Sequence, residues 1–323
     1  MKFHSRQWLA GFALLFSSAA HGQSIPFSSK ELYPEGIAYN PAANAFFVSS
    51  LHYGTIGQVD RRGTYKPIIQ DEALVSTTGL AVDAKRNRLL VCVADPGVST
   101  RTDQATQGKL AKLAIYSLKT GRRTALIDLG SLGAGGHFAN DVAVAPDGTA
   151  YVTDSFSPQI WQVTPAGKAS VLVRNDAFAG EGFNLNGIVY HPAGFLLVAK
   201  SSDGKLFKID LRHPERPEPV ATAALPGVDG LVLNDRNELL AIQNGSDSGQ
   251  ISQLTTADNW ATATAQGTAR SEKTFPTTGS LVQGRYYVLN AKANELFDPK
   301  AVRTSDFLIQ QVQFGGNASG RTN

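Results

Sequence analysis

Six short stretches of the sequence place an oxygen-bearing side chain before a small residue, usually glycine, and an apolar run. These side chains recur about every 43 to 62 positions: Glu35, Thr78, Asn140, Asn186, Asp229 and Thr278. Carboxylate, amide and hydroxyl oxygens suit Ca²⁺ and, in a tighter octahedron, Mg²⁺. The set contains no His or Cys, which argues against zinc or copper. The six residues therefore indicate a calcium site if the fold brings them together, and otherwise they only cap strand starts.

A second polar position follows each of these copies after roughly 12 to 17 residues, where an apolar run ends. These residues are Ser50, Asp95, Asp154, Lys200, Asn244 and Asn290. Two matched positions in each of six units favour six similar units closed in a ring over a sandwich or a β-solenoid. Short runs rich in Val, Ile, Leu, Tyr and Phe, parted by Gly, Pro, Asn and Asp, are typical of strands. The predicted fold is therefore all-β, a six-bladed β-propeller.

Propeller topology predicts where these polar side chains lie. The first strand of each blade lines the central channel, so the six residues before these strands converge at one mouth of the channel. The loop from the second to the third strand returns to the same face. Asp154, Lys200 and His52 are therefore expected at the rim as substrate contacts, with Lys200 facing Asp154 and Asp95. The last unit shows three strands, and we expect residues 24–29 to supply the fourth.

The N-terminus has the pattern of a secretory signal. Lys2 and Arg6 precede an apolar run of about nine residues, and small residues follow at positions 20–22. We expect a signal peptide at 1–22, a propeller at 23–315, a flexible tail at 316–323, and a secreted or periplasmic protein. A formal net charge of +3 gives no indication of nucleic acid or, after signal cleavage, of a membrane partner. Cys92 lies in an apolar run and is expected to be a buried, inert thiol.

The pairs that begin the units resemble the senescence-marker-protein/gluconolactonase family, which includes regucalcin. They are Glu35-Gly36, Asn140-Asp141, Asn186-Gly187 and Asp229-Gly230, with 276–278 (Pro-Thr-Thr) before the last unit. Strictosidine-synthase-like and paraoxonase-like propellers are similar in outline. The resemblance covers roughly residues 30–315 and implies one divalent metal on the axis. It implies Glu35, Asn186 and Asp229 as metal ligands, and Asn140 as a further ligand or a substrate contact.

Two stretches of the sequence depart from the pattern of this family. Lactonases of the family usually carry an arginine two residues before the asparagine of the third blade, and Phe138 stands there instead. The stretch after Glu35-Gly36 also lacks the usual proline and tryptophan. Sugar-acid lactones need polar anchors, so Phe138 as a substrate contact suggests a less polar ligand.

Two functions remain open from the sequence. The first is a metal-dependent hydrolase, a lactonase or esterase, in which the cation polarises the substrate carbonyl and a protein base activates water. Asp229 is the first candidate for this base and His137 the second, and the ligand is a small molecule. The chain has no Gly-x-Ser-x-Gly nucleophile motif. The alternative is a non-catalytic exported propeller that binds a small molecule or a protein.

Overall fold

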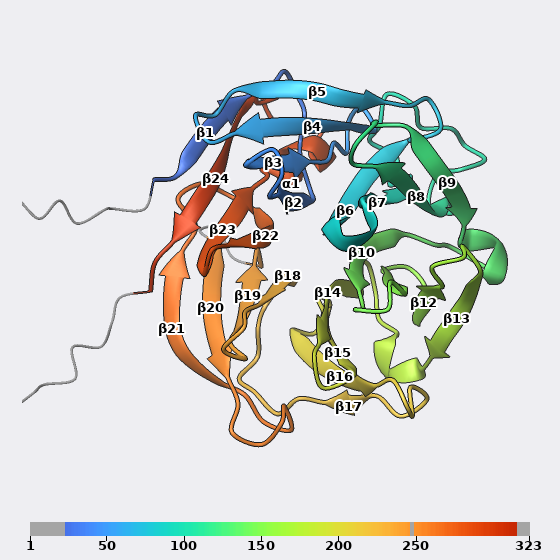
Figure 1. The fold of residues 1–323 in the computed structure, drawn as a ribbon, viewed down its shortest axis with the longest axis vertical. Helices are drawn as coiled ribbons and strands as arrows, with labels where there is room; N and C mark the ends of the chain where they lie inside the picture. The colour runs from blue at the N-terminus through green and yellow to red at the C-terminus, as the bar shows by residue number, and fades with distance from the viewer. Residues whose placement is uncertain (1–22, 246–248, 315–323) are drawn as a thin grey trace, which may run out of the picture.

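The computed structural model describes residues 23–245 and 249–314, which form six four-stranded antiparallel sheets around a central axis (Figure 1). This arrangement confirms the prediction of an all-β, six-bladed propeller. The expected signal peptide at 1–22 and the expected tail at 316–323 lie outside the described residues. Within those residues, none of the helices has the length and apolar character that a membrane span requires.

The first three blades are meanders whose strands follow one another outward from the axis. Blade 1 contains β2 (Ile37–Asn40), β3 (Ala45–Val48), β4 (Thr55–Asp60) and β5 (Tyr65–Gln70). Blade 2 contains β6 (Ser76–Asp83), β7 (Arg88–Ala94), β8 (Ala111–Ser117) and β9 (Arg123–Asp128). Blade 3 contains β10 (Ala139–Val144), β11 (Ala150–Asp154), β12 (Gln159–Val163) and β13 (Ala169–Arg174).

The next two blades repeat this order, and the last blade combines strands from both ends of the chain. Blade 4 contains β14 (Leu185–His191), β15 (Phe195–Lys200), β16 (Lys205–Asp210) and β17 (Glu218–Pro219). Blade 5 contains β18 (Val228–Leu233), β19 (Leu239–Gln243), β20 (Gln250–Thr255) and β21 (Thr264–Arg270). Blade 6 contains β22 (Pro276–Val282), β23 (Arg285–Asn290), β24 (Asp306–Val312) and β1 (Ile25–Ser28).

Strand β1 closes the ring, as the sequence predicts for residues 24–29. It pairs antiparallel with β24, with Ile25 opposite Ile309 and Phe27 opposite Phe307 (Figure 1). Ile25 and Phe27 are buried while the residues between and after them are exposed, so one face of β1 enters the core. Burial of one such side chain contributes about 1.5–3 kcal/mol. The pairing therefore stabilises the closed ring and covers the edge of β24.

The second strand of each blade is the most deeply buried because it packs between the two neighbouring blades. Every residue of β11, β15 and β19 is buried. These strands read as continuous apolar runs, as expected for strands covered on both faces. Cys92, in β7, is a free and fully buried thiol, in agreement with its predicted structural role.

Helical structure among the described residues is confined to short turns. They are η1 (Ala84–Arg86), η2 (Gly130–Leu132), η3 (Asp176–Phe178) and α1 (Ala293–Phe297). Helix α1 stands in the connection between β23 and β24. It is the turn that contributes to the candidate site, because Ala293 and Phe297 line the same cavity as the polar residues described below.

The innermost strands of blades 3, 4 and 5 each contain a β-bulge close to their first residue. In blade 3, Ala139 pairs with Asp154 but Val142 pairs with Val152, so β10 holds one extra residue. A bulge of this kind bends the strand and turns side chains in new directions. Here it allows Asn140 and Asp141 to point toward different ends of the channel.

The second bulge position is held by glycine in blades 2, 4 and 5. A Cβ atom on Gly187 would lie 2.4 Å from the Asp229 carbonyl oxygen, and one on Gly79 would lie 2.4 Å from Asp141 Oδ1. These distances are too short for any side chain, so glycine lets the inner strands converge on the axis. The sequence repeat of polar residue plus glycine is thus a consequence of this convergence.

Candidate functional site

Four of the six predicted ring residues line one cavity of about 170 Å³ at the mouth of the channel. Glu35 comes just before β2, and Asn140, Asn186 and Asp229 are the second residues of β10, β14 and β18. The structure thus brings together the complete set that the sequence predicts for a metal: Glu35, Asn140, Asn186 and Asp229. That they bind a metal remains a prediction.

Neighbouring side chains hold the two ring asparagines in one orientation. Asn140 Nδ2 donates to Ser155 Oγ at 2.9 Å, and Asn186 Nδ2 donates to Ser201 Oγ at 3.0 Å. Both serine hydroxyls in turn donate to backbone carbonyls of the next blade. Because the amide nitrogens are engaged in this way, the amide oxygens are left to face other partners. Asn140 Oδ1 is buried and has no hydrogen-bond partner among the described residues.

The ionised forms of the two ring carboxyls, Glu35 and Asp229, are electrostatically unfavourable without a bound cation. Burial, together with the charges of Asp229 and Asp141, raises the pKa of Glu35 well above its usual range, and Glu35 Oε2 has no partner among the described residues. Burial raises the pKa of Asp229 to about 8, although Asn244 Nδ2 donates to Asp229 Oδ2 at 2.5 Å. A buried ionised carboxylate without a counter-charge is costly, so these groups favour either a proton or a cation.

A hard divalent cation fits this donor set. Two carboxylates would balance its charge, and Asn140 Oδ1 and Glu35 Oε2 are buried acceptors without partners in the described structure. The described residues contain no cluster of three or more His, Cys, Asp or Glu side chains arranged for a metal. The ring instead combines two carboxylates with amide oxygens, as calcium sites often do.

The two threonines of the predicted ring do not complete it. Thr78 Oγ1 donates to the Ala139 carbonyl at 2.8 Å, so it links blade 2 to blade 3. In blade 6 the register shifts between Pro276 and Gly279, which gives Thr277 the position that Asn140 holds in blade 3. Thr277 lines the cavity and donates to the Glu35 carbonyl at 2.8 Å, whereas Thr278 faces the other side of the channel. The expectation for Thr278 was therefore wrong by one residue.

The same one-residue difference affects Asp154 and Lys200 of the second predicted set, whereas Asn244 of that set lines the cavity. The cavity-facing side chains are Ser201 and Asn244, and Ser155 corresponds to them by register. Asp154 and Lys200 stand one residue earlier, and adjacent side chains of a strand point to opposite faces. Neither lines the cavity.

Asp154 and Lys200 instead stabilise their own loops. Asp154 accepts from the Phe138 backbone N–H at 3.0 Å and contacts His137 Nδ1 at 2.7 Å. Lys200 Nζ donates to Asp203 at 3.1 Å and to the Ala177 carbonyl at 3.2 Å. The expectation that Lys200 faces Asp154 and Asp95 is therefore not met.

Both candidate histidines lie outside the cavity lining. His137 is buried; the hydrogen bond to Asp154 raises its pKa and outweighs the effect of burial. The edge of its ring faces Gly133, which is not a lining residue. His52 packs against Tyr53 and lies 3.8 Å from the carboxylate of Glu31. Of the predicted substrate contacts, Phe138 and Asn140 line the cavity.

Several lining residues were not predicted as site residues. They are Leu51, Phe183, Ser201, Phe275, Thr277, Ala293 and Phe297. Ser201 follows Asn186 by the same interval that separates Asn244 from Asp229, so a shared spacing in the sequence could have identified it. The apolar residues come from unrelated loops and follow no repeat.

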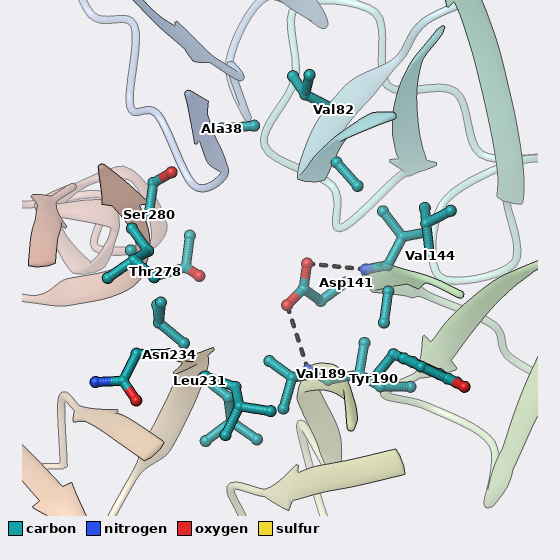
Figure 2. A pocket seen from close by; sticks show the side chains of 18 of the residues that line it. Ala38, Val82, Asp141, Val144, Val189, Tyr190, Leu231, Asn234, Thr278 and Ser280 are labelled. Atoms are coloured by element: carbon teal, nitrogen blue, oxygen red, sulfur yellow. Dashed lines mark hydrogen bonds between the residues drawn. The ribbon is translucent and has the colours of Figure 1, made fainter. Parts of the chain in front are cut away.

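A second, larger cavity of about 650 Å³ occupies the channel on the other side of the ring (Figure 2). Its walls are mainly apolar side chains of the six inner strands. Asp141 projects into it and accepts from the backbone N–H groups of Val142 at 2.8 Å and Ile188 at 3.4 Å. Burial raises the pKa of Asp141 to about 7. Asp141 is therefore a third carboxyl, on the other side of the ring, whose charge raises the pKa values of Glu35 and Asp229.

The sequence matches no family model and no curated protein. Its structure is similar to the major allergen Mala s 1 of Malassezia sympodialis, with 19% identity, a TM-score of 0.69, and coverage of 90% of this chain and 96% of that one. A gluconolactonase from Xanthomonas campestris shares 15% identity with a TM-score of 0.60, covering 89% and 90%. The calcium-binding protein regucalcin from Agrobacterium tumefaciens shares 15% identity with a TM-score of 0.58, covering 88% and 91%.

These similarities extend over nearly the whole propeller. Propellers of the gluconolactonase and regucalcin type, to which the sequence motifs pointed, are thus among the structures that share this fold. At such low identities the likeness shows the fold, and the roles of individual residues must be argued from their geometry.

Proposed function

We propose that this protein is an exported, divalent-metal-dependent hydrolase that opens a lactone or an ester at a Ca²⁺ site on the propeller axis. The observation that carries this proposal is the pair of buried oxygens, Glu35 Oε2 and Asn140 Oδ1, that have no partner among the described residues. They share a cavity with Asn186 and Asp229. The signal-like pattern at residues 1–22 supports export.

Glu35, Asn186 and Asp229 would hold the cation, and Asn140 would be a further ligand or a substrate contact. When bound, the cation supplies Lewis-acid polarisation of the substrate carbonyl. Asp229 accepts a proton from water, whose oxygen attacks the acyl carbon. The bond from this carbon to the leaving oxygen breaks, that oxygen takes up the proton, and the products are a carboxylic acid and a hydroxyl group. Asn244 holds Asp229 in place for this proton transfer.

A non-catalytic propeller that binds a small molecule or a protein is the alternative. It is favoured by the position of His137, whose ring lies outside the cavity lining. The carboxyls that line the described cavity, Glu35 and Asp229, are both candidate metal ligands. Catalysis therefore requires Asp229 to act as ligand and as base.

Metal analysis and a substrate screen test the two functions together. Native mass spectrometry of the purified protein, before and after chelation, is expected to show one calcium for each chain. Aliphatic lactones, sugar lactones and aryl esters are then assayed with and without calcium. Calcium-dependent hydrolysis supports the enzyme, whereas bound calcium without turnover across the panel supports the binding protein. Failure to bind any divalent cation contradicts the proposed site.

A further inference from the structure

Four phenylalanine rings form a connected layer at the candidate site, which we call the aromatic rim: Phe138, Phe156, Phe183 and Phe297. Phe183 is the centre of the layer. Its ring centroid lies 5.2 Å from that of Phe138, 5.1 Å from that of Phe156 and 6.3 Å from that of Phe297. Phe138 and Phe156 are themselves 5.2 Å apart. The rim therefore joins loops of blades 3, 4 and 6.

Two rings of the rim are exposed to an unusual degree. Phe183 is 38% exposed and Phe297 is 44% exposed. Their contact links the start of blade 4 to the end of α1 in blade 6, and these blades are not neighbours, so the pair reaches over the mouth of the cavity. Both rings also line the cavity that holds the polar ring residues. Exposed aromatic surface beside a polar site is typical of a ligand-binding surface.

The remaining walls favour an uncharged ligand. Leu51, Phe275 and Ala293 add apolar surface, and the residues that line this cavity include no Lys, Arg or His. The ionisable side chains in the lining are the two carboxyls, Glu35 and Asp229. Among the described residues, the lining therefore offers no cationic side chain to recognise a carboxylate or a phosphate on the substrate.

The volume of the cavity is close to that of a cavity that binds one aromatic ring. It measures about 170 Å³, and an engineered apolar cavity of about 150 Å³ holds benzene. The two contacts of Phe183 with other rings of the lining are edge-on, with interplanar angles of 88° to Phe138 and 72° to Phe297, whereas the contacts of Phe156 are tilted. Aromatic rings favour such edge-to-face packing over a stacked sandwich, so the rim can extend the same pattern to a ligand ring.

We propose that the aromatic rim binds the aromatic ring of a neutral lactone or ester whose carbonyl lies among Glu35, Asn140, Asn186 and Asp229. This inference rests on the proposed hydrolase function and specifies its substrate class. It predicts that the protein prefers substrates whose lactone or ester carries an aromatic substituent, independently of the reactivity of the carbonyl.

The test compares γ-benzyl-γ-butyrolactone with γ-methyl-γ-butyrolactone in the calcium-loaded protein. A methylene group separates the phenyl ring from the lactone, so the two carbonyls have similar reactivity. A favourable apolar subsite changes kcat/KM by about tenfold or more, and we expect this preference for the benzyl lactone. Phe183→Ala and Phe297→Ala should each reduce this preference, measured as the ratio of the two kcat/KM values, by about threefold or more.

Two further variants separate an aromatic contact from general effects. Phe183→Leu keeps an apolar side chain and should retain part of the preference. Leu132→Ala changes a side chain that is 37% exposed and lies outside the cavity lining, so it should retain all of it. Equal kcat/KM values for the two lactones in the wild type, or an unchanged preference in both Phe→Ala variants, would overturn the proposal.

Binding of ketones that cannot be hydrolysed distinguishes this inference from the proposed function. Calorimetry with 2-benzylcyclopentanone and 2-methylcyclopentanone should show selective binding of the benzyl ketone, and Phe183→Ala should weaken it. If this holds while no lactone is hydrolysed, the hydrolase function fails and the aromatic subsite stands as a binding site. If both lactones are hydrolysed equally and the ketones bind equally, the function stands and the aromatic subsite fails. If neither ketone binds, the aromatic subsite fails as well.

Discussion

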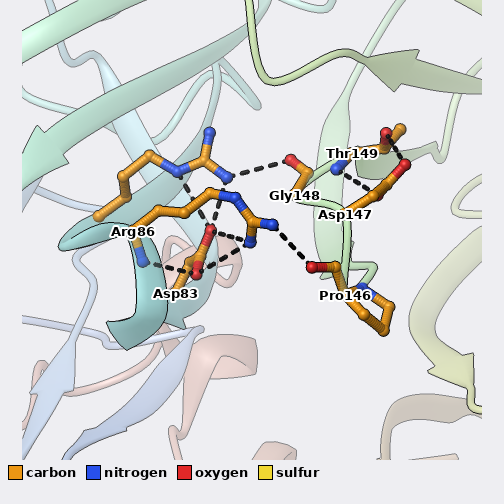
Figure 3. A network of polar contacts seen from close by, with 7 residues as sticks. Asp83, Arg86, Pro146, Asp147, Gly148 and Thr149 are labelled. Carbon is orange, nitrogen blue, oxygen red and sulfur yellow. Dashed lines mark hydrogen bonds and ion pairs between the residues drawn. The ribbon is translucent and has the colours of Figure 1, made fainter.

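Two groups of buried carboxyls at opposite ends of the inner strands differ in how their charge is compensated. At the far end of β6, Asp83 Oδ2 lies 2.6 Å from Arg88 Nη2 and 3.2 Å from Arg86 Nη1. The two guanidinium groups also donate to the Pro146 and Gly148 carbonyls of blade 3 (Figure 3). At the channel mouth, Glu35 and Asp229 have no cationic side chain in the cavity that they line.

The pKa values follow this difference. Burial opposes ionisation of Asp83, but hydrogen bonds from Arg88 and Arg86 outweigh it and hold its pKa below the usual range. Burial of Glu35 and Asp229 is not offset, and their pKa values are raised. An unpartnered buried polar group costs about 1–3 kcal/mol. The first group therefore joins two blades, whereas the second weakens the unliganded fold and is suited to a ligand.

The largest expected effect is on catalysis, through Asp229→Asn. This change keeps a carbonyl oxygen but removes the charge and the proton acceptor. If Asp229 is both ligand and base, hydrolysis at saturating calcium should stay lower by about 10²–10⁴-fold. His137→Ala should cost less, because His137 lies outside the cavity. Full activity of Asp229→Asn once calcium is saturating would show that another group activates water.

The stability of the chelated protein should fall as pH rises. The pKa of Asp229 is raised to about 8 in the folded state, against about 3.9 in an unfolded chain. Its favourable contribution is thus fully present below about pH 4 and is lost as pH rises to about 8. One such group changes the unfolding free energy by at most about 1.4 kcal/mol per pH unit. Urea unfolding from pH 5 to 8 measures this.

Calcium provides the control for that pH series. A cation that favours the ionised carboxylates should flatten the fall in stability across the same range. Asp83 changes the unfolding free energy in the opposite direction. Because its pKa is lowered, its contribution to stability is lost as the pH falls below about 4. A chelated protein that is equally stable at pH 5 and pH 8 would contradict the raised pKa values of the ring.

Arg88→Ala should destabilise the protein without affecting its calcium response. It leaves Asp83 with Arg86 as its remaining cation, and loss of one partner from a mostly buried pair costs about 2 kcal/mol after allowance for Arg86. The midpoint of urea unfolding should shift, while the stabilisation by added calcium stays that of the wild type. A reduced calcium response would show that the two ends of the blades are coupled.

The smallest expected effect has opposite signs with and without metal. Glu35→Gln removes one of the facing negative charges, so the chelated variant should be more stable than the chelated wild type, by about 1 kcal/mol. Added calcium should stabilise it less, because the variant binds the cation more weakly. Melting temperatures of both proteins with chelator and with calcium measure the two effects. An equal calcium response in both would exclude Glu35 from the site.

The repeat in the sequence was sufficient to predict the six blades, the N-terminal closure and four polar residues of the cavity, Glu35, Asn140, Asn186 and Asp229. It was sufficient because the glycines after Glu35, Asn186 and Asp229 mark where the inner strands converge. The exact register was not predictable, because a bulge adds one residue without any signature in composition. Thr278 was therefore chosen where Thr277 lies. His137 was misplaced because proximity in sequence to Asn140 does not determine the direction of a side chain.

The aromatic rim could be predicted only in part. Phe138 was recognised because it stands at a fixed distance from Asn140. Phe297 comes from α1, a short insertion in blade 6 that no repeat describes. Its contact with Phe183 depends on the closed ring, which brings the loops of blades 4 and 6 over one mouth.

The pairing of β1 with β24 also determines the order in which the chain can finish folding. Ile25 is among the first described residues to be synthesised, and its partner Ile309 is among the last. The hydrophobic face of β1 therefore has no native partner until synthesis is almost complete. Bringing two such distant segments together carries a loop-closure entropy cost, although this cost grows only slowly with length. A chain that stops before Asp306 would leave the first strand unpaired and the last blade open.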